Sequence, residues 1–432
     1  MDSHFYLPQF QETTQKIKSI PHARIGEIAT FSHETTDFSE FPEGEFQYLE
    51  ISGVSIGTNT YETTLTNVKD APSRAKLKTK VGDIVLSTTR PHRGAAAQIS
   101  DPTVIASTGF AVIREVDNSV DREWFFYTLL SNLVLRQLLQ RSSGGNYPAI
   151  LEEEIKKVYL PLVDEKKQLD MVRMLKRGLA DFKEKRERAA ELLAALENEL
   201  MGFFKLGQTA NKELCFSVRL GDLDGVIAVN RYRSLEKNIG HLHLKIADVC
   251  EIIEEKIKAS NYGQEQIDWI RIDDLPNQPA DIETVRTQPA DQVDGSFFHV
   301  REGDILVARL GPTILNQKIV LVRHLERKTI ASSEFLVLRC RDGFNPEVVM
   351  AVLKTPYYRD LLYSYARGST PSRYRLNRED MLKLPFPDIR ADQTAIFEKV
   401  TSVQARAKNL RAQAESDWKA AKETFERALL EG

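Results

Sequence analysis

One short stretch occurs twice, as Val81-Gly82-Asp83-Ile84-Val85-Leu86 and as Glu302-Gly303-Asp304-Ile305-Leu306-Val307, at an offset of 221 residues. Two further blocks keep this offset. They are Ile25-Gly26-Glu27-Ile28 with Ile246-Ala247-Asp248-Val249, and Tyr48-Leu49-Glu50-Ile51 with Trp269-Ile270-Arg271-Ile272. Three separated blocks in one register indicate an internal duplication, and each copy is expected to build the same structural unit.

The duplication continues along the chain with a small drift in the offset. The run from Ile105 to Arg114 matches the run from Ile330 to Arg339 at an offset of 225, and Leu160-Pro161 matches Leu384-Pro385 at 224. The drift predicts small insertions in loops between two otherwise equivalent modules.

Short apolar runs rich in β-branched residues predict the strands of each module. We expect strands at 84–87 and 111–114 in the first copy and at 305–308 and 335–339 in the second, and a further strand at 24–28. Helical periodicity with aromatic residues at 123–141 and 346–366 makes each module a mixture of α and β structure. The Gly-Asp pair before Ile84 and Ile305 is interpreted as a turn into a core strand.

After Pro161 and Pro385 the composition shifts to Ala, Glu, Lys, Arg, Gln and Leu, which favour helices. Apolar residues there recur at spacings of three and four, which predicts coiled-coil seams; ordinary amphipathic helices packed on the modules are the alternative. The first stripe is Val172, Leu175, Leu179, Phe182, Ala189, Leu193, Leu196 and Leu200, interrupted at Arg186. The second is Ile396, Val400, Val403, Ala407, Leu410, Ala414, Ala421 and Ala428, interrupted at Asp417 and Thr424.

The predicted fold class is α+β, with two tandem α/β modules joined by two long helices. We expect the helices to form an antiparallel coiled coil with pseudo-twofold symmetry, in a register that sets Phe182 against Ala414 and Leu175 against Ala421. The expected boundaries are 1–161 for the first module, 162–204 for the first helix, 205–387 for the second module and 388–432 for the second helix.

The bulk properties exclude several classes of protein. No run of eighteen apolar residues and no secretory signal pattern occurs, which predicts a soluble, cytoplasmic protein. Cys215, Cys250 and Cys340 lie far apart and form no Cys-x-x-Cys pair, so we expect neither a disulfide framework nor a zinc site. The net charge of -3 argues against binding nucleic acid by bulk electrostatics, so any DNA contact must come from local basic patches.

The order of these blocks resembles the specificity subunit of Type I restriction-modification enzymes. The resemblance rests on Arg24 to Ile28, Gly82 to Ser87, Ala106 to Val112, and Leu160-Pro161-Leu162 leading to Gln168. Two features depart from that family: Leu162-Val163-Asp164-Glu165 lacks the second proline that Leu384-Pro385-Phe386-Pro387 keeps, and Glu334 stands where the first copy has Gly109.

The resemblance implies a non-catalytic subunit. Its modules would be target recognition domains that each read one half of a split site in double-stranded DNA, and its helices would set the gap between the halves. It would bind two adenine-N6 methyltransferase subunits and, through them, restriction/translocase subunits. The cofactors S-adenosylmethionine and ATP are expected in those partners, and no cofactor is expected in this chain.

Candidate DNA-contacting residues are basic and amide side chains in loops. Cations contact phosphates, whereas arginine and amide side chains can read base edges. Arg90, Arg93 and Asn146 are expected at bases and the lysines at phosphates. The candidates of the first module are Lys76, Lys78, Lys80, Thr88, Arg90, His92, Arg93, Arg141 and Asn146. Those of the second are Arg309, Asn316, Gln317, Lys318, Arg367, Ser369, Thr370, Arg373 and Arg375. The alternative is that these residues are solvated loop charges.

Enzyme signatures are weak. No glycine-rich cofactor loop with an Asn-Pro-Pro-aromatic block, Walker loop or His-Glu-x-x-His occurs, so the chain is not expected to be an enzyme. A nuclease site of the Glu-x-Lys type at Glu254-Glu255-Lys256 with Asp248 would need converging carboxylates, which this spacing does not supply. Two alternatives remain: a recognition subunit of a related methylation or defence system, and a coiled-coil adaptor that binds proteins. The basic, acid-poor segment 74–94 favours DNA binding over the adaptor alternative.

Overall fold

The computed structural model describes residues 8–38, 44–207, 242–275 and 285–431, so Cys215 lies outside the described residues. These residues form two compact units. Unit 1 comprises 1–185 and 413–432, and unit 2 comprises 186–412. Each unit therefore contains one module together with a segment of both long helices.

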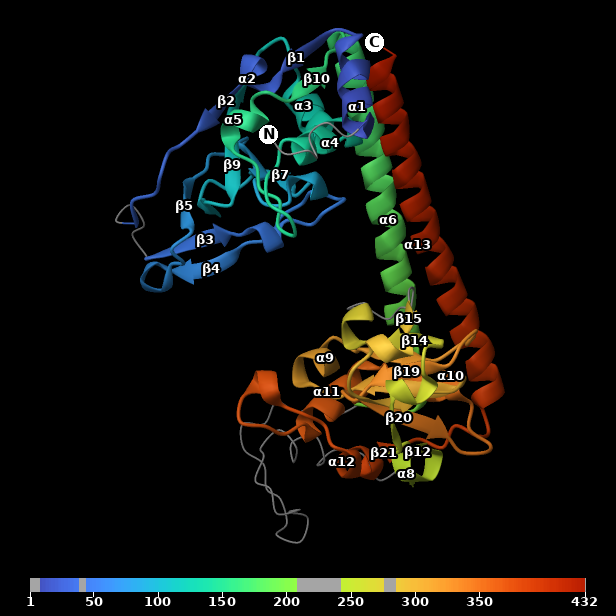
Figure 1. Ribbon diagram of the computed structural model, residues 1–432. Helices are drawn as coiled ribbons and strands as arrows, with labels where there is room; N and C mark the ends of the chain where they lie inside the picture. The colour runs from blue at the N-terminus through green and yellow to red at the C-terminus, as the bar shows by residue number, and fades with distance from the viewer. Residues whose placement is uncertain (1–7, 39–43, 208–241, 276–284, 432) are drawn as a thin grey trace. The chain divides into compact units, whose positions relative to one another are not determined.

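Unit 1 is built from three small sheets and the helices that cover them (Figure 1). Its strands are β1 (His22–Arg24), β2 (Ala29–Ser32), β3 (Glu45–Leu49), β4 (Thr64–Asn67), β5 (Ala75–Lys78), β6 (Ile84–Ser87), β7 (Ala96–Gln98), β8 (Val104–Ser107), β9 (Phe110–Val116) and β10 (Tyr159–Pro161). Its helices are α1 (Pro8–Lys18), α2 (Ile25–Ile28), α3 (Arg122–Leu129), α4 (Asn132–Gln140) and α5 (Glu152–Ile155), with 3-10 turns η3 (Ile51–Gly53), η4 (Val68–Asp70) and η5 (Pro91–Arg93).

Unit 2 repeats this series of elements. Its strands are β11 (Leu244–Lys245), β12 (Cys250–Ile252), β13 (Lys256–Lys258), β14 (Gln266–Ile270), β15 (Arg286–Pro289), β16 (Ser296–His299), β17 (Asp304–Ala308), β18 (Ile319–Leu321), β19 (Thr329–Ser332), β20 (Phe335–Cys340) and β21 (Pro385–Phe386). Its helices are α8 (Ile246–Val249), α9 (Gly311–Leu315), α10 (Pro346–Leu353), α11 (Pro356–Tyr365) and α12 (Arg378–Lys383), with η7 (Ala259–Tyr262), η8 (Ile272–Asp274), η9 (Ala290–Gln292) and η10 (Pro371–Arg373).

The two units share one sheet topology. The order β2-β9-β6-β7 in unit 1 corresponds to β12-β20-β17-β18 in unit 2, and β4-β3-β8-β5 corresponds to β15-β14-β19-β16. Within the second sheet the pairs β3–β8 and β14–β19 are both parallel. Unit 2 adds β13 at an edge where unit 1 has an isolated bridge between Thr35 and Leu77. The predicted duplication is confirmed at the level of topology.

The predicted strands at 84–87, 111–114, 305–308 and 335–339 are confirmed, but the strand at 24–28 is wrong. Residues Ile25–Ile28 form the one-turn helix α2, and Ile246–Val249 form its counterpart α8. An acidic side chain three residues into each turn explains the difference. Glu27 accepts a hydrogen bond from the backbone N–H of Arg24, and Asp248 accepts one from that of Lys245. Such a contact closes a helical turn at its N-terminus.

The predicted helical regions 123–141 and 346–366 are each divided into two short helices. The break in the second region is at Thr355-Pro356, because the Pro356 nitrogen has no hydrogen to donate and begins a new helix at its first position. In unit 1, α3 and α4 contribute the buried residues Trp124, Phe125, Leu129, Val134 and Leu138 to the main core.

The two long helices are present as α6 (Glu165–Phe203) and α13 (Gln393–Leu430). In unit 1 their segments lie side by side (Figure 1), with the ring centroids of Phe182 and Trp418 6.4 Å apart. A Cβ atom on Gly178 would lie 3.1 Å from Ala421 Cβ. Residue numbers rise along one helix as they fall along the other, so the segments run antiparallel. The expected facing of Leu175 and Ala421 is wrong by about one turn.

The second predicted stripe changes phase after Ala414. Trp418, Phe425 and Leu429 are buried in the core of unit 1, whereas Ala421 and Ala428 are only partly buried. The spacing from Leu410 through Ala414 to Trp418 is four and then four again. A strict heptad count assumes that spacings of three and four residues alternate. It therefore misses the place where two successive spacings of four move the buried positions to another side of the helix.

The residues of the stripes have different surroundings along the helices. Met171, Val172 and Leu175 of α6 join the core of the first module, as amphipathic helices packed on a module would. In unit 2, by contrast, Ala189, Leu193 and Ala407 form a cluster of helix residues alone. Among the described residues, no helix is both long and apolar enough to cross a membrane.

Candidate nucleic-acid interface

Two loops that are distant in sequence meet in unit 1. The segment after β6 and the segment after α4 are joined by bridges from Ala149 to Thr89 and to Ser143. The Thr88 carbonyl accepts a hydrogen bond from Ile150 at 2.9 Å, and the Thr88 N–H donates to the Gly109 carbonyl at 2.8 Å. The structure thus brings together the two segments that the sequence analysis had named separately.

Arg90 links the two loops. Its backbone N–H donates to the Pro148 carbonyl at 2.6 Å, and its Nη2 donates to the Asn146 carbonyl at 3.1 Å. The guanidinium carbon lies 4.2 Å from the ring centroid of Tyr147. Arg93, Asn146 and Tyr147 are exposed, so the tip of this loop pair is polar, aromatic and open to a ligand.

Unit 2 has the same loop pair. Bridges join Arg375 to Leu310 and to Arg367. The Gly311 N–H donates to the Tyr374 carbonyl at 2.7 Å, and the Leu376 N–H donates to the Arg309 carbonyl at 2.8 Å. Each of these four contacts has a counterpart in unit 1, made by Thr89, Ser143, Arg90 and Ile150. The corresponding residues are 221 to 226 positions apart in the sequence.

An ion pair fixes the base of each loop pair. Arg141 Nη1 lies 3.0 Å from Glu154 Oε2 in unit 1, and Arg367 Nη2 lies 2.9 Å from Asp380 Oδ1 in unit 2. Glu154 and Asp380 are 226 positions apart, whereas the bridges align Arg367 with Ser143, so the two arginines reach their carboxylates from neighbouring positions and not from the same one. Arg141 and Arg367 were named as DNA contacts, and the structure places their charges against acidic partners.

The tips above these anchors differ. Unit 1 has five residues between its bridged positions, 144–148, and unit 2 has seven, 368–374. The second tip exposes Ser369, Thr370 and Arg373. Gly368 is required there, because a Cβ atom would lie 2.5 Å from the Arg373 carbonyl oxygen. The scaffold is shared and the exposed side chains are not.

The remaining candidates of unit 1 occupy other positions. Lys76 is exposed on β5, and Lys78 is half-buried at the end of that strand. Lys80 Nζ pairs with Glu34 Oε1 at 2.9 Å. The loop pair lies near Arg74, just before β5, because Thr88 of the loop pair bonds to Gly109 and the neighbouring Thr108 N–H donates to the Arg74 carbonyl. Lys80 follows the other end of β5 and therefore lies toward the opposite end of the sheet.

His92 lies between the half-buried Arg90 and the exposed Arg93. Its Nδ1 is buried and makes no hydrogen bond within the described residues. Burial, followed by the charges of Arg93 and Arg90, lowers the pKa of His92 below its ordinary value of 6.5. Its imidazole is therefore neutral near pH 7 in the unbound protein.

The candidates around α9 in unit 2 have mixed surroundings. Asn316 is exposed at the end of that helix. Gln317 Nε2 donates to the Lys354 carbonyl, and Lys318 Nζ donates to the Ile272 carbonyl at 3.0 Å. Arg309 is half-buried, and Arg375 Nη2 donates to Glu334 Oε1 at 3.0 Å.

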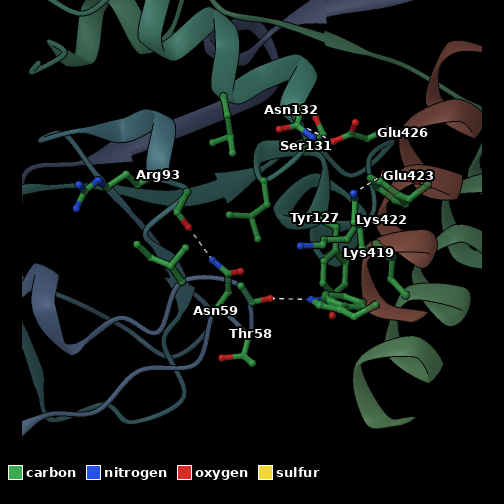
Figure 2. Close-up of a pocket in the computed structure, with 18 residues that line it drawn as sticks. Thr58, Asn59, Arg93, Tyr127, Ser131, Asn132, Lys419, Lys422, Glu423 and Glu426 are labelled. Atoms are coloured by element: carbon green, nitrogen blue, oxygen red, sulfur yellow. Dashed lines mark hydrogen bonds and ion pairs between the residues drawn. The ribbon is translucent and has the colours of Figure 1, made fainter. Parts of the chain in front are cut away.

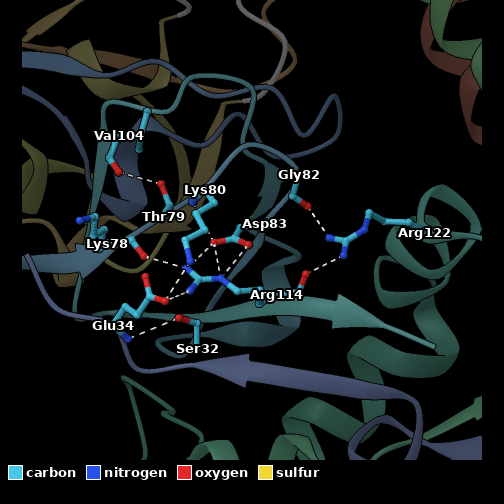
Figure 3. A network of polar contacts seen from close by, with 10 residues as sticks. All are labelled: Ser32, Glu34, Lys78, Thr79, Lys80, Gly82, Asp83, Val104, Arg114 and Arg122. Atoms are coloured by element: carbon cyan, nitrogen blue, oxygen red, sulfur yellow. Dashed lines mark hydrogen bonds and ion pairs between the residues drawn. The ribbon is translucent and has the colours of Figure 1, made fainter. Parts of the chain in front are cut away.

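The repeated Gly-Asp turn holds a buried ion pair that sequence reasoning missed. Asp83 accepts from the Lys80 N–H at 2.9 Å and lies 3.0 Å from Arg114 Nη2 (Figure 3). In unit 2, Asp304 pairs with Arg339 at 2.8 Å. The signal was present as an arginine at the same place in each repeat, residues 114 and 339.

A cavity of about 400 Å³ in unit 1 is lined by Arg93 and Gly94 of the loop after β6 and by Trp418 of α13 (Figure 2). Asn59 Nδ2 donates to the carbonyls of Gly94 and Ala96, at 2.8 and 2.9 Å, and Trp418 Nε1 donates to the Gly57 carbonyl at 3.0 Å. Through the segment that holds Gly57 and Asn59, the loop after β6 is connected to helix α13.

The carboxylates of the nuclease alternative have separate partners. Asp248 caps α8, and Glu254 Oε1 lies 2.5 Å from Arg378 Nη1. The described part of the chain contains no group of three or more potential metal ligands.

Comparison with known proteins identifies the class of domain. Residues 22–192 match the family model described as Type I restriction modification DNA specificity domain. The chain is 28% identical over 148 residues to the HindI specificity subunit of Haemophilus influenzae, and 25% identical over 186 residues to the MjaVIII specificity subunit of Methanocaldococcus jannaschii. These matches cover 33% and 41% of this chain.

The chain spans 32% and 43% of the length of those two relatives. Among solved structures, the HsdS subunit from Thermoanaerobacter tengcongensis covers 94% of this chain and 95% of its own, with 18% identity and a TM-score of 0.38. A chain from a study of assembly of the type I R-M system covers 94% and 96%, with 17% identity and a TM-score of 0.48. Residues 22–192 therefore resemble the DNA specificity domain of Type I restriction-modification systems, and the chain is similar in sequence to two specificity subunits of such systems.

Proposed function

We propose that this chain is the non-catalytic DNA-recognition subunit of a Type I restriction-modification complex. The observation that carries the proposal is the repeated loop pair: equivalent bridges, hydrogen bonds and ion pairs hold tips of different length and composition. A shared scaffold with unlike tips suits two domains that read different halves of one bipartite DNA site.

The tips supply the proposed base contacts. Arg90, Arg93 and Asn146 in unit 1, and Asn316, Ser369, Thr370 and Arg373 in unit 2, offer donors suited to base edges in the major groove. Lys76 and the other exposed cations are assigned to phosphates. Arg141 and Arg367 are assigned to the scaffold, because their charges are already paired.

The long helices are proposed to set the distance between the two half-sites and to bind two adenine-N6 methyltransferase subunits. Those partners would carry S-adenosylmethionine, and restriction/translocase subunits joined to them would use ATP. Deleting or inserting whole heptads in both helices should change the gap and leave the half-sites intact. A change in the bases read, with the gap constant, would contradict the spacer role.

Methylome sequencing of cells that express the chain with its methyltransferase tests the proposal. We expect methylation at a bipartite, asymmetric sequence. Exchanging residues 144–148 for 368–374 should transfer base preferences between half-sites, whereas the conservative change Arg141→Lys at the base should leave the motif intact. A single continuous motif would overturn the two-reader proposal.

A further inference from the structure

Arg90 occupies a backbone conformation that its residue type disfavours. Its φ and ψ are both 50°, in the left-handed region, where the Cβ atom crowds the following carbonyl. The equivalent residue in unit 2, Gly311, begins helix α9 and does not have a positive φ, so the left-handed conformation belongs to unit 1 alone. A residue other than glycine in this region is strained, and such strain is concentrated at functional positions. The fold alone does not explain why an arginine occupies this strained position, so a function of its side chain is needed to account for it.

Two contacts hold the Arg90 side chain in place. Its guanidinium stacks over the Tyr147 ring at 4.2 Å, and Nη2 donates to the Asn146 carbonyl at 3.1 Å. Tyr147 is 70% exposed, so this stack lies at the surface of the tip. Stacking on an aromatic face and a hydrogen bond together restrict the plane of a guanidinium, which reduces the conformational entropy lost when it binds a ligand.

Among the residues that the structure describes, the guanidinium keeps a complete pair of parallel donors without a hydrogen-bond partner. It has five N–H groups, and the hydrogen bond to Asn146 uses one hydrogen of Nη2. Whichever hydrogen is used, one edge of the fork still presents two donors side by side. In the major groove, guanine presents two adjacent acceptors, O6 and N7, whereas adenine presents one acceptor beside a donor. The free edge of Arg90 thus fits guanine.

We propose that Arg90 reads a guanine in the half-site of unit 1, and that Tyr147 is the positioning residue that holds its guanidinium plane. The inference rests on the proposed function and makes it specific, because it names one base and the residue that reads it.

Methylome sequencing of cells that express the full chain with its methyltransferase provides the test. In Arg90→Gly the left-handed conformation no longer carries the Cβ penalty, which offsets part of the loss of the contacts with Tyr147 and Asn146, so the variant should remain folded. Discrimination for guanine at one position of one half-site should fall about 10- to 100-fold. Arg90→Lys, which keeps the charge and loses the fork, should relax the same position, and the other half-site should not change.

Variants of Tyr147 separate positioning from packing. Tyr147→Phe retains the ring and should preserve the wild-type motif, whereas Tyr147→Ala should relax the same guanine position. Lys76→Ala is the control: an exposed cation assigned to phosphate should lower methylation of all sites alike.

The outcomes distinguish a failure of the proposed function from a failure of the guanine contact. If wild-type cells show no bipartite motif that depends on this chain, the proposed function fails. If the motif is present and Arg90→Gly leaves every guanine as stringent as before, or weakens all sites uniformly, the guanine contact is wrong and the proposed function stands.

Discussion

Arg367 Nη2 lies 2.9 Å from Asp380 Oδ1, and this ion pair lies at the base of the loop pair of unit 2 as the pair of Arg141 and Glu154 does in unit 1. The side chain of Asp380 is 3% exposed, whereas that of Glu154 is 32% exposed. The carboxylate of the pair is therefore more deeply buried in the second module, whereas its arginine is more exposed, at 43% for Arg367 and 15% for Arg141.

Removing the anchor should destabilise unit 2 more than unit 1. Arg367→Gln removes the arginine that is paired with the buried carboxylate of Asp380, at a cost of about 2 to 3 kcal/mol in the free energy of unfolding. Arg141→Gln should cost less, because Glu154 retains Lys157 at 2.6 Å and some solvent. Urea denaturation measures both. Arg373→Gln at the exposed tip is the control, with an expected change within about 0.5 kcal/mol; equal losses for all three would contradict an anchoring role.

The buried aspartates should likewise differ between the units. Asp304→Asn removes a carboxylate paired twice with Arg339 at 2.8 Å, and should cost about 3 kcal/mol. Asp83→Asn should cost less, because Arg114 keeps Glu34 at 2.6 Å. Thermal denaturation of both variants and of Glu34→Gln checks the order, and equal losses for Asp83→Asn and Asp304→Asn would show that Glu34 does not compensate.

Two glycines of α6 offer a matched pair. Gly178→Leu should destabilise unit 1 by about 1 to 3 kcal/mol, since even a Cβ there would lie 3.1 Å from Ala421. Gly202→Leu meets nothing within 4 Å and should raise stability by up to about 1 kcal/mol through helix propensity. Chemical denaturation distinguishes them, and equal effects would mean that the helices do not pack closely at Gly178.

Cys250 should resist alkylation in the folded protein. Its hydrogen bond with Cys340, at 3.6 Å between sulfurs, and its burial raise the pKa of Cys250, and the thiolate is the reactive form. Iodoacetamide labelling followed by peptide mass spectrometry should modify the half-buried Cys340 first and Cys250 only in denaturant. Labelling of Cys250 at the rate of a free thiol would show that the strand pair opens in the native state.

Stability should fall as the pH drops below about 6.5. Burial and two neighbouring arginines lower the pKa of folded His92 below its unfolded value, so the unfolded state binds more protons in this range. The stabilisation is complete above the unfolded pKa and declines toward the lowered folded pKa. His92→Gln should reduce the difference in melting temperature between pH 7.5 and 5.5. Some dependence should remain, because burial also lowers the pKa of His299.

Sequence patterns predicted the duplicated modules and the elements with a buried apolar face. The strands at Ile84 and Ile305 and the two long helices follow from hydrophobic patterning that is present twice. Contacts between distant segments were not predictable: nothing in the sequence near Thr89 indicates that it bridges to Ala149, or that Asp83 pairs with Arg114. The change of phase at Trp418 was missed because heptad counting treats the apolar stripe as straight.

The division of the long helices between the units affects how the chain can fold during synthesis. Unit 2 is one continuous segment, 186–412, whereas unit 1 needs residues 413–432 to complete its core with Trp418, Phe425 and Leu429. Domains fold as units while the ribosome extends the chain. The second module in the sequence therefore has all its residues first, and the first waits for the last turns of α13 to leave the ribosome.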